Sequence, residues 1–560
     1  MRNIWRFKAL AALLLVTLIA PVSGQLGGAD KAYAATPSNP NATQAVQDVL
    51  NYFDTVYTNN KIISGQFVSD VYGFNEIDHI GYLASKYPAM IGMDFGYKHT
   101  NGTLGEVADW RNYMVAQATD YWKKGGLVQL SWHETNPLDA TPDDGGWNSV
   151  ISTMTQANFD KVTTPGTPEY AKWLAHVDTI AGYLKTLRDQ GVVVLWRPYH
   201  EMNIGFWWGG KSQASFKKLW QNMYDRLTNY HGLNNLIWVW APARDNFNAV
   251  PGGFYPGASY VDLGGADVYA EESTNEKFSL ANAELAAIMN GKRYGLSEVA
   301  KLPDLAALKN TFDYTWLLTW STGWLDNEFY GSPGGNGPGN IGWDVRAFYQ
   351  SPDTITRADV PAFGRTIVPE TFIFKDAFNV YINGVIVSLS NWTTTATGGA
   401  VALSNEKTVG LAGRDQSMKI SKTSTTGETS AKRTFGPQTG IVNVKATIRT
   451  EEASWKDFLV VDSSSPSKVA LHIGLQNGYL RAYDGSTLVA LQPIDYAKWY
   501  DVKAVLNTTT KKYDLYVNGV KKGDQLSFRD TGAVNLNKLA FGVASNDTGT
   551  LYVDNVRIDK

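Results

Sequence analysis

The sequence predicts an α/β protein in which a (β/α)8 TIM barrel is followed by an all-β sandwich domain of the jelly-roll type. Between about residues 43 and 351, short apolar runs alternate with stretches of helical spacing. Eight such runs over about 300 residues match the strand number and the size of that barrel. Beyond residue 371 the helical spacing disappears, and short runs rich in Val, Ile, Tyr and Thr follow one another, as in antiparallel sandwiches.

Four segments are expected along the chain. Arg2, Arg6 and Lys8 precede the apolar run Ala9–Ala20, and a small-x-small cleavage site ends at Ala34, which is typical of a secretory signal peptide. The apolar run is too short to span a bilayer, which needs about 20 residues. We therefore expect a secreted, extracellular monomer without a membrane partner. Its segments are a signal peptide (1–34), a catalytic barrel (35–351), a linker (352–370) and a β-sandwich (371–560).

The composition of the chain argues against a nucleic-acid partner and against disulfide bonds, and it is unusually rich in aromatic residues. The 560-residue chain has a formal net charge of −3, so it has no excess of basic residues for binding nucleic acid. It has no cysteine, so its stability must come from core burial rather than from disulfides. Its 19 Trp and 29 Tyr are more than a core needs. Two explanations stay open: flat aromatic faces that bind sugar rings, or dense core packing.

The order of strands and helices decides where functional residues are expected. Active sites of TIM barrels lie at the carboxyl ends of the strands, on the loops that follow. Helices are expected at 170–190, which Gly191 ends, at 212–230 and at 343–349. The eight expected strands are 62–67, 89–95, 127–132, 192–196, 236–240, 261–268, 294–297 and 314–320.

Two glutamates stand at these strand ends. Glu201 follows the fourth expected strand and Glu298 the seventh. A retaining glycosidase needs two carboxylates about 5–5.5 Å apart, one to protonate the departing oxygen and one to attack the anomeric carbon. Two rim charges are the alternative, but the Trp, His and Tyr residues beside both glutamates favour a catalytic pair. Further candidates at strand ends are Trp132, His133, Arg197, His200, Asp267, Tyr269 and Trp320.

Six short motifs carry a resemblance to a known family. They are SGQ (64–66), SWHETNP (131–137), WRPYHEMN (196–203), FWWG (206–209), GGADVY (264–269) and SE (297–298). The Arg-Pro-x-His-Glu-Met-Asn string is specific, whereas the Ser-Glu pair alone is weak. Over roughly residues 40–350 the chain resembles glycoside hydrolase family 26, the clan A group that contains secreted β-mannanases.

The resemblance implies an endo-β-1,4-mannanase that hydrolyses mannan, glucomannan or galactomannan by a retaining double displacement. It implies Glu201 as the general acid/base and Glu298 as the nucleophile, and Arg197 is expected to keep Glu298 ionised. It implies no cofactor and no catalytic metal, with a polysaccharide as the only partner. The residues expected to bind the substrate are His133, His200, Trp207, Tyr269 and Trp320.

Other functions stay open. A β-1,3-xylanase or a mixed-linkage β-glucanase would belong to the same family. A non-catalytic polysaccharide-binding protein is the alternative of another class, although a pure binder would not need a nucleophile. A metal-dependent hydrolase would need His-x-His at a strand end or His-Glu-x-x-His on a helix, and neither occurs. Four further histidines are expected to be structural or surface groups: His79, His99, His176 and His231.

The segment 371–560 is expected to form an antiparallel sandwich. Asn-Gly at 383–384 and at 518–519 and Asp-Gly at 484–485 predict tight hairpin turns. The segment resembles the lectin-type jelly rolls of secreted polysaccharide hydrolases, which implies a carbohydrate-binding module. A structural spacer and a cell-surface contact domain are the alternatives. Asp376 and Asp554 are candidate ligands of a structural Ca²⁺ in this domain.

Overall fold

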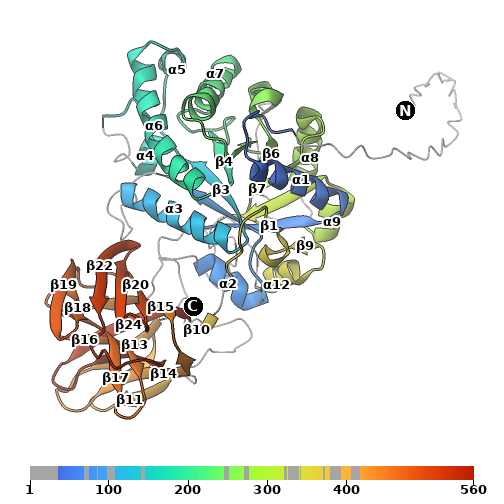
Figure 1. Ribbon diagram of the computed structural model, residues 1–560. Helices are drawn as coiled ribbons and strands as arrows, with labels where there is room; N and C mark the ends of the chain where they lie inside the picture. Colours follow the sequence, from blue (N-terminus) through green and yellow to red (C-terminus); the bar gives the residue numbers. More distant parts are fainter. Residues whose placement is uncertain are drawn as a thin grey trace, which may run out of the picture. The chain divides into compact units, whose positions relative to one another are not determined.

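The computed structural model in Figure 1 contains a barrel of alternating strands and helices and a separate all-β domain. The expected signal peptide lies outside the described residues. The ranges that the structure describes are 36–68, 75–84, 86–96, 107–140, 146–244, 251–269, 276–320, 342–369, 372–376, 392–404 and 417–560, with the single residues 325, 340 and 378.

Eight parallel strands close into a barrel, as predicted. Each strand pairs with its neighbours in chain order, and β1 pairs with both β2 and β8, which closes the ring. The fourth strand begins two residues later than predicted, and the seventh continues to Val299. The strands are β1 Ile62–Phe67, β2 Met90–Asp94, β3 Leu127–Trp132, β4 Val194–Pro198, β5 Leu236–Trp240, β6 Leu263–Val268, β7 Tyr294–Val299 and β8 Tyr314–Thr319.

Helices surround the strands of the barrel in Figure 1. The α-helices are α1 Gln44–Thr58, α2 Asn75–Ala84, α3 Val107–Lys123, α4 Gly146–Val150, α5 Gln156–Val162, α6 Pro168–Asp189, α7 Gln213–Tyr224, α8 Glu276–Met289, α9 Leu305–Asn310 and α12 Gly342–Gln350. Short 3-10 turns occupy η2 Pro251–Phe254, η3 Ala258–Tyr260 and η5 Arg357–Asp359. The predicted helix 212–230 is α7 followed by a π-helical turn, η1 Asp225–Tyr230.

The longest helix, α6, shows how local sequence sets an element. Its N-cap Thr167 accepts a hydrogen bond from the Tyr170 amide at 3.1 Å, and Pro168 occupies the first turn, where its missing N–H costs nothing. Gly191 follows the helix with φ of 70°, a conformation that favours glycine. The apolar residues repeat at helical spacing, so they are buried along one face: Trp173, Val177, Ile180, Leu184 and Leu187.

A short ninth strand, β9 Thr354–Ile355, extends the barrel sheet. It pairs in parallel with β1, and the Ser64 hydroxyl donates to the Ile355 carbonyl at 2.6 Å. Val360 belongs to the hydrophobic core of the barrel. The segment 352–370 was expected to be a linker, but its first residues are therefore part of the barrel.

Dense core packing accounts for much of the tryptophan content. Most of the largest fully buried side chains of the described residues are indoles, and all of these lie in the barrel. They are Trp122, Trp132, Trp173, Trp196, Trp207, Trp208, Trp220, Trp238, Trp240 and Trp316.

The C-terminal domain consists of antiparallel strands in two sheets, which confirms the predicted fold class. One sheet has the order β12-β13-β24-β15-β20-β21-β22, with β10 also on β24, and the other β11-β14-β23-β16-β17-β18-β19. One hydrophobic cluster contains side chains from both sheets. The strands are β10 Phe372–Asp376, β11 Thr393–Ala396, β12 Gly399–Ser404, β13 Ser417–Lys422, β14 Thr429–Gln438, β15 Ile441–Thr450, β16 Lys456–Asp462, β17 Lys468–Gln476, β18 Tyr479–Asp484, β19 Thr487–Pro493, β20 Tyr500–Asn507, β21 Lys512–Val517, β22 Val520–Ser527, β23 Leu536–Val543 and β24 Gly549–Asp559.

Two of the three predicted hairpin turns occur in this domain. Asn518 and Gly519 join β21 to β22 with φ of 49° and 77°, and Gly485 lies between β18 and β19 with φ of 58°. The turn at 383–384 lies outside the described residues. The Ca²⁺ at Asp376 and Asp554 stays a prediction, because the described part of the chain does not include the Asp376 side chain. No helix within the described ranges is long and apolar enough to cross a bilayer.

Candidate active site

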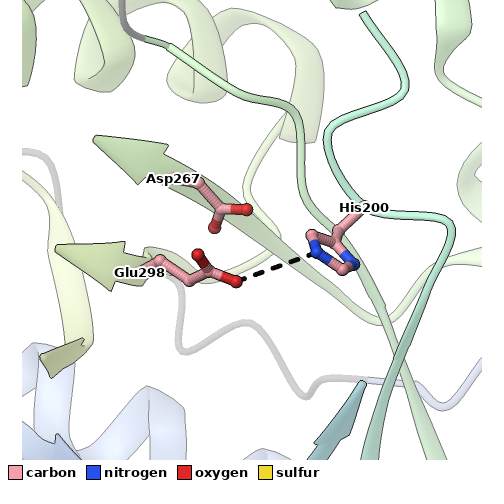
Figure 2. Close-up of side chains that lie close together, drawn as sticks. All are labelled: His200, Asp267 and Glu298. Carbon is pink, nitrogen blue, oxygen red and sulfur yellow. Dashed lines mark ion pairs between the residues drawn. The ribbon is translucent and has the colours of Figure 1, made fainter. Parts of the chain in front are cut away.

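The predicted site residues of five different strands gather at the carboxyl end of the barrel. Figure 2 shows Asp267 on β6 and Glu298 on β7 with their carboxylates directed toward the imidazole of His200, which follows β4. Ligand atoms of these three residues lie within 4.8 Å of one another. These three side chains therefore lie close together, as their positions at the strand ends predicted.

Arg197, the central cation of this cluster, is fully buried. Its Nη1 donates to both carboxylate oxygens of Asp267, at 3.0 and 2.8 Å, and its Nη2 donates to Oε1 of Glu298. Its Nε donates to the Ser131 hydroxyl at 3.1 Å, and the Ser297 hydroxyl donates to Asp267 at 2.6 Å. One guanidinium thus connects β3, β4, β6 and β7.

The charges of this cluster depend on one another. Burial alone would lower the pKa of Arg197, but the carboxylates of Asp267 and Glu298 outweigh it and raise the pKa, so the guanidinium stays charged. Burial raises the pKa of Asp267; Arg197 opposes this rise and Glu298 adds to it. The buried guanidinium is therefore the group that stabilises two carboxylates so close together.

Glu298 is held at both oxygens. Arg197 binds Oε1, and the phenol of Tyr269 donates to Oε2 at 2.5 Å. Only 3 % of Glu298 is exposed. Burial is the main reason that the pKa of Tyr269 lies well above its usual value, and the charges of Glu298 and Glu201 raise it further. Tyr269 therefore keeps its proton and can only donate to Glu298.

Two histidines lie edge to face beside Glu298. Nε2 of His200 lies 3.1 Å from Nε2 of His133 and 3.8 Å from Oε1 of Glu298. Nδ1 of His133 lies 2.8 Å from the Asp94 carboxylate, which also accepts from the His133 amide at 3.1 Å. Burial opposes ionisation of Asp94, but the charge and hydrogen bonds of His133 outweigh it and lower the pKa of Asp94.

His200 is neutral in this environment. Burial is the largest cause of a pKa far below its usual value, and the charges of Arg197 and His133 act in the same direction. Nδ1 of His200 is buried and has no hydrogen-bond partner among the described residues.

Glu201 occupies a turn with an unusual backbone. Its φ is 53° and that of Tyr199 is 45°, in the left-handed region that non-glycine residues rarely adopt. The Glu201 amide donates to the Ala241 carbonyl at 2.8 Å, and Asn203 exchanges two hydrogen bonds with the Ala243 backbone. Glu201 is half-buried, and its charge acts on both Arg197 and Tyr269. The turn after β4 therefore places Glu201 within electrostatic reach of Arg197 and Tyr269, the two partners of Glu298.

The aromatic residues of the site correct one prediction. Trp207 was expected to bind substrate, but it is fully buried and its indole N–H donates to the Glu134 carbonyl at 2.8 Å. It therefore has no surface to offer a sugar, and it packs against Tyr199 and Trp208. Trp320 is half-buried, and its ring centroid lies 4.1 Å from that of Phe67. Its position agrees with a role in holding a sugar.

Several residues of the site were not assigned from the sequence. Trp147 is 44 % exposed, and its ring centroid lies 5.6 Å from His133 and 5.9 Å from Phe206. The strand-end positions could also have identified Asp94, the last residue of β2, and Trp147, which lies on α4 in the segment that follows β3. Both were overlooked because no recognised motif contains them.

The His200, Asp267 and Glu298 cluster does not fit a metal ion. It is the only group of three potential ligands within the ranges that the structure describes. Arg197 already binds both carboxylates, and its charge would repel a divalent cation at the same position. The donor set therefore suits a guanidinium rather than a metal.

Comparisons with known proteins agree with this geometry. The profile of glycosyl hydrolase family 26 matches residues 38–334. A mannan endo-1,4-beta-mannosidase of Bacillus subtilis strain 168 is 32% identical over 325 residues, which cover 55% of this chain and 83% of that protein. A mannan endo-1,4-beta-mannosidase of Thermothelomyces thermophilus is 32% identical over 306 residues, which cover 53% of this chain and only 59% of that relative.

A solved structure gives the same result for the fold. The structure of GH26A from a Muricauda species has 32% sequence identity and a TM-score of 0.50, and the match covers 58% of this chain and 99% of that one. Residues 38–334, the part that the family profile matches, contain all the site residues described above. The chain therefore belongs to glycosyl hydrolase family 26 and is a glycoside hydrolase.

Proposed function

We propose that the protein is a secreted, monomeric endo-β-1,4-mannanase that hydrolyses mannan, glucomannan or galactomannan with retention of anomeric configuration. The observation that carries the proposal is the carboxylate of Glu298, held between Arg197 and Tyr269 next to the turn that presents Glu201. The substrate class is supported by the relatives, which are mannan endo-1,4-beta-mannosidases. Catalysis in this family needs no cofactor.

Glu298 is the proposed nucleophile. Its oxygen forms a bond to the anomeric carbon while the glycosidic C–O bond breaks, and Glu201 gives its proton to the departing oxygen. In the second step Glu201 takes a proton from water, the water oxygen attacks the anomeric carbon, and Glu298 leaves. Arg197 and Tyr269 hold the two oxygens of Glu298, so the carboxylate is oriented before the sugar arrives.

His200, His133 and Trp320 are the proposed contacts of the sugar at the cleavage point. A neutral His200 adds no positive charge beside Glu298, so Arg197 remains its main cationic partner. The exposed ring of Trp147 and the half-buried ring of Trp320 offer apolar surface, on which sugar rings can pack. We also assign substrate contact to Trp147 for this reason.

A substrate panel tests the proposal. Mannan, glucomannan, galactomannan, β-1,3-xylan and lichenan are each incubated with the enzyme, and the product lengths are read by chromatography. We expect internal cleavage of the β-1,4-mannans, and NMR in the first minutes should show the β-anomer as first product. If the enzyme preferentially cleaves β-1,3-xylan or lichenan, that polysaccharide is the substrate instead of mannan. If a polysaccharide binds but is not cleaved, a non-catalytic polysaccharide-binding protein is favoured.

For the C-terminal domain we propose a carbohydrate-binding module with Trp455 as its aromatic platform. Trp455 precedes β16, outside the hydrophobic core of the domain, and is half-exposed. A Cβ at Gly474 would lie 2.3 Å from its indole, so the ring lies over a position that must be glycine. Its Nε1 donates to Asp457 at 2.6 Å, and Asp457 is also 2.7 Å from Nε2 of His472.

These contacts hold the indole in place before any ligand binds, which reduces the entropy cost of binding. Affinity electrophoresis in gels containing mannan tests the assignment with Trp455→Ala in the full chain. Ile441→Ala on the other sheet is a matched control, because Ile441 is 46 % exposed and apolar. Retardation lost only in Trp455→Ala would support the platform. Equal migration of all variants with and without mannan would favour a structural spacer or a cell-surface contact.

A further inference from the structure

A buried carboxylate lies behind the active site, on the residue after His133. Glu134 is fully buried at the end of β3. Its Oε2 accepts a hydrogen bond from the Tyr199 hydroxyl at 2.8 Å, and its Oε1 lies 3.0 Å from Nδ1 of His176 on α6. A buried carboxylate is costly unless its oxygens are bound, so these contacts explain how Glu134 is tolerated.

The hydroxyl of Tyr199 both accepts and donates a hydrogen bond. It accepts a hydrogen bond from Nε1 of Trp173 at 2.6 Å and donates its own proton to Glu134. Burial, and next the charge of Glu134, raise the pKa of Tyr199 well above its usual value, so the phenol keeps that proton. The ring packs against Trp207 and Trp208, with centroids 6.0 and 5.6 Å away.

The backbone of Tyr199 needs such support. Its φ of 45° is a left-handed conformation that is unfavourable for a non-glycine residue. Glu201, two residues later, has a left-handed φ of 53°. Strained conformations of this kind persist where surrounding contacts determine them. The hydroxyl of Tyr199 and the carboxylate of Glu134 provide such a contact from a different strand.

The backbone of Glu134 makes a second contact with the segment that contains Glu201. Its carbonyl accepts from Nε1 of Trp207, which lies on the other side of Glu201 in the chain. Trp208 in turn donates to the His200 carbonyl at 2.9 Å. Tyr199 before Glu201 and Trp207 after it are therefore both hydrogen-bonded to Glu134. Trp208, the neighbour of Trp207, is hydrogen-bonded to His200.

We propose that Glu134 is a positioning residue, which acts through Tyr199 to hold Glu201 in the orientation that general acid catalysis requires. The inference rests on the proposed role of Glu201. Tyr199→Phe keeps the ring and its packing and removes only the hydroxyl. Glu134→Gln keeps an oxygen that can accept from Tyr199 and removes the charge.

Leaving-group dependence tests this role. A misplaced acid slows cleavage of a mannooligosaccharide, whose departing oxygen needs a proton, far more than attack on dinitrophenyl β-mannoside, whose leaving group departs unaided. We expect Tyr199→Phe to lower kcat/KM at least about tenfold on the oligosaccharide and less than about threefold on the dinitrophenyl glycoside. The ratio of kcat/KM on the oligosaccharide to kcat/KM on the dinitrophenyl glycoside should fall less in Glu134→Gln than in Tyr199→Phe. It should fall more in Glu134→Ala.

A matched control separates positioning from stability. Tyr314, on strand β8, is like Tyr199 a buried tyrosine, and its hydroxyl donates to the Phe278 carbonyl at 2.6 Å. Tyr314→Phe should lower the melting temperature without changing the ratio of the kcat/KM values on the two substrates. Equal losses on both substrates in Tyr199→Phe, or a ratio no different from that of Tyr314→Phe, would overturn the proposal.

The role of Glu201 is checked separately with Glu201→Ala in the same assay. If Glu201→Ala shows the leaving-group dependence and Tyr199→Phe does not, the positioning role is wrong while the proposed function stands. If Glu201→Ala does not show it, the proposed function itself fails.

Discussion

Arg197 and Glu298 are joined by a buried ion pair between two strands that are 101 residues apart in the sequence. The same guanidinium binds Asp267, so the orientation of Glu298, the proposed nucleophile, depends on a network rather than on a single contact. Because neither Arg197 nor Asp267 is exposed, water cannot replace a partner that is removed.

Replacement of Arg197 should therefore be costly in two ways. Arg197→Met leaves Asp267 and Glu298 buried without their shared cation, and breaking a buried pair in this way costs about 3–5 kcal/mol. We expect that loss in the free energy of unfolding, measured by urea denaturation, together with a loss of most of kcat. Arg197→Lys should recover part of the stability but little activity, because an ammonium cannot bind both carboxylates in the same fork geometry. Full activity of the lysine variant would contradict the positioning of Glu298 by Arg197.

Glu201 and Glu298, the proposed catalytic pair, should respond differently to a good leaving group. Glu201→Ala should lose most activity on mannan but much less in the first step with dinitrophenyl β-mannoside. The glycosyl-enzyme should then accumulate, and azide should restore turnover because it attacks without losing a proton. Glu298→Ala should not be rescued in this way, since no covalent intermediate forms. Stopped-flow release of dinitrophenol measures the first step. Equal losses in both variants without an azide effect would show that Glu201 is a charge at the rim of the barrel and not the acid/base.

The boundary of an independent barrel should lie near residue 369 rather than near 351. The pairing of β9 with β1, the core residue Val360 and the hydrogen bond from the Val368 amide to Lys123 all lie beyond Ser351. A chain of residues 36–369 should fold and cleave short soluble mannooligosaccharides, whereas one ending at 351 should be less stable by about 3 kcal/mol or more, since it loses buried apolar residues. Calorimetry of the two chains checks this. Equal stability would show that the β9 segment contributes nothing.

If the sandwich binds polysaccharide, the chain 36–369 should also act more slowly than the full chain on insoluble mannan, because the local concentration of enzyme at the surface falls. Its rate on soluble oligosaccharides is the control. Equal rates on insoluble mannan would contradict the binding module.

Asp462 should make the sandwich sensitive to acid. Burial alone would raise its pKa, but the amides of Val534, Asn535 and Ser464 donate to its oxygens and lower the pKa far below its usual value. A lowered folded-state pKa stabilises the fold at pH values above the unfolded pKa of about 3.9, and this stabilisation is lost as the pH falls further. Asp462→Asn should be less stable at pH 7 by about 1.5–3 kcal/mol. The difference from wild type should shrink between pH 4 and pH 2 in urea unfolding, and a constant difference would contradict this account.

The sequence predicted the site largely through one rule, that polar residues after the strands of a parallel barrel share one end of it. Glu201, Glu298, Arg197, Asp267 and Tyr269 were all found in this way. Trp207 and Trp147 show the limit of the rule, since both are tryptophans in segments that follow strands of the barrel. The first is fully buried and the second is 44 % exposed, and only the packing of the surrounding helices distinguishes them.

The order of strands and helices and the gathering of the strand-end residues at one end of the barrel were determined by the sequence alone, because apolar periodicity and strand-end position are local properties of the chain. The tertiary structure decided which side chains meet: the link from Glu134 to Tyr199, the contact of Asp94 with His133 and the addition of β9 to β1. Each of these joins segments that are distant in the sequence, and β9 is only two residues long, too short to show any periodicity. Burial and hydrogen-bond partners follow from such long-range packing, and no local pattern encodes them.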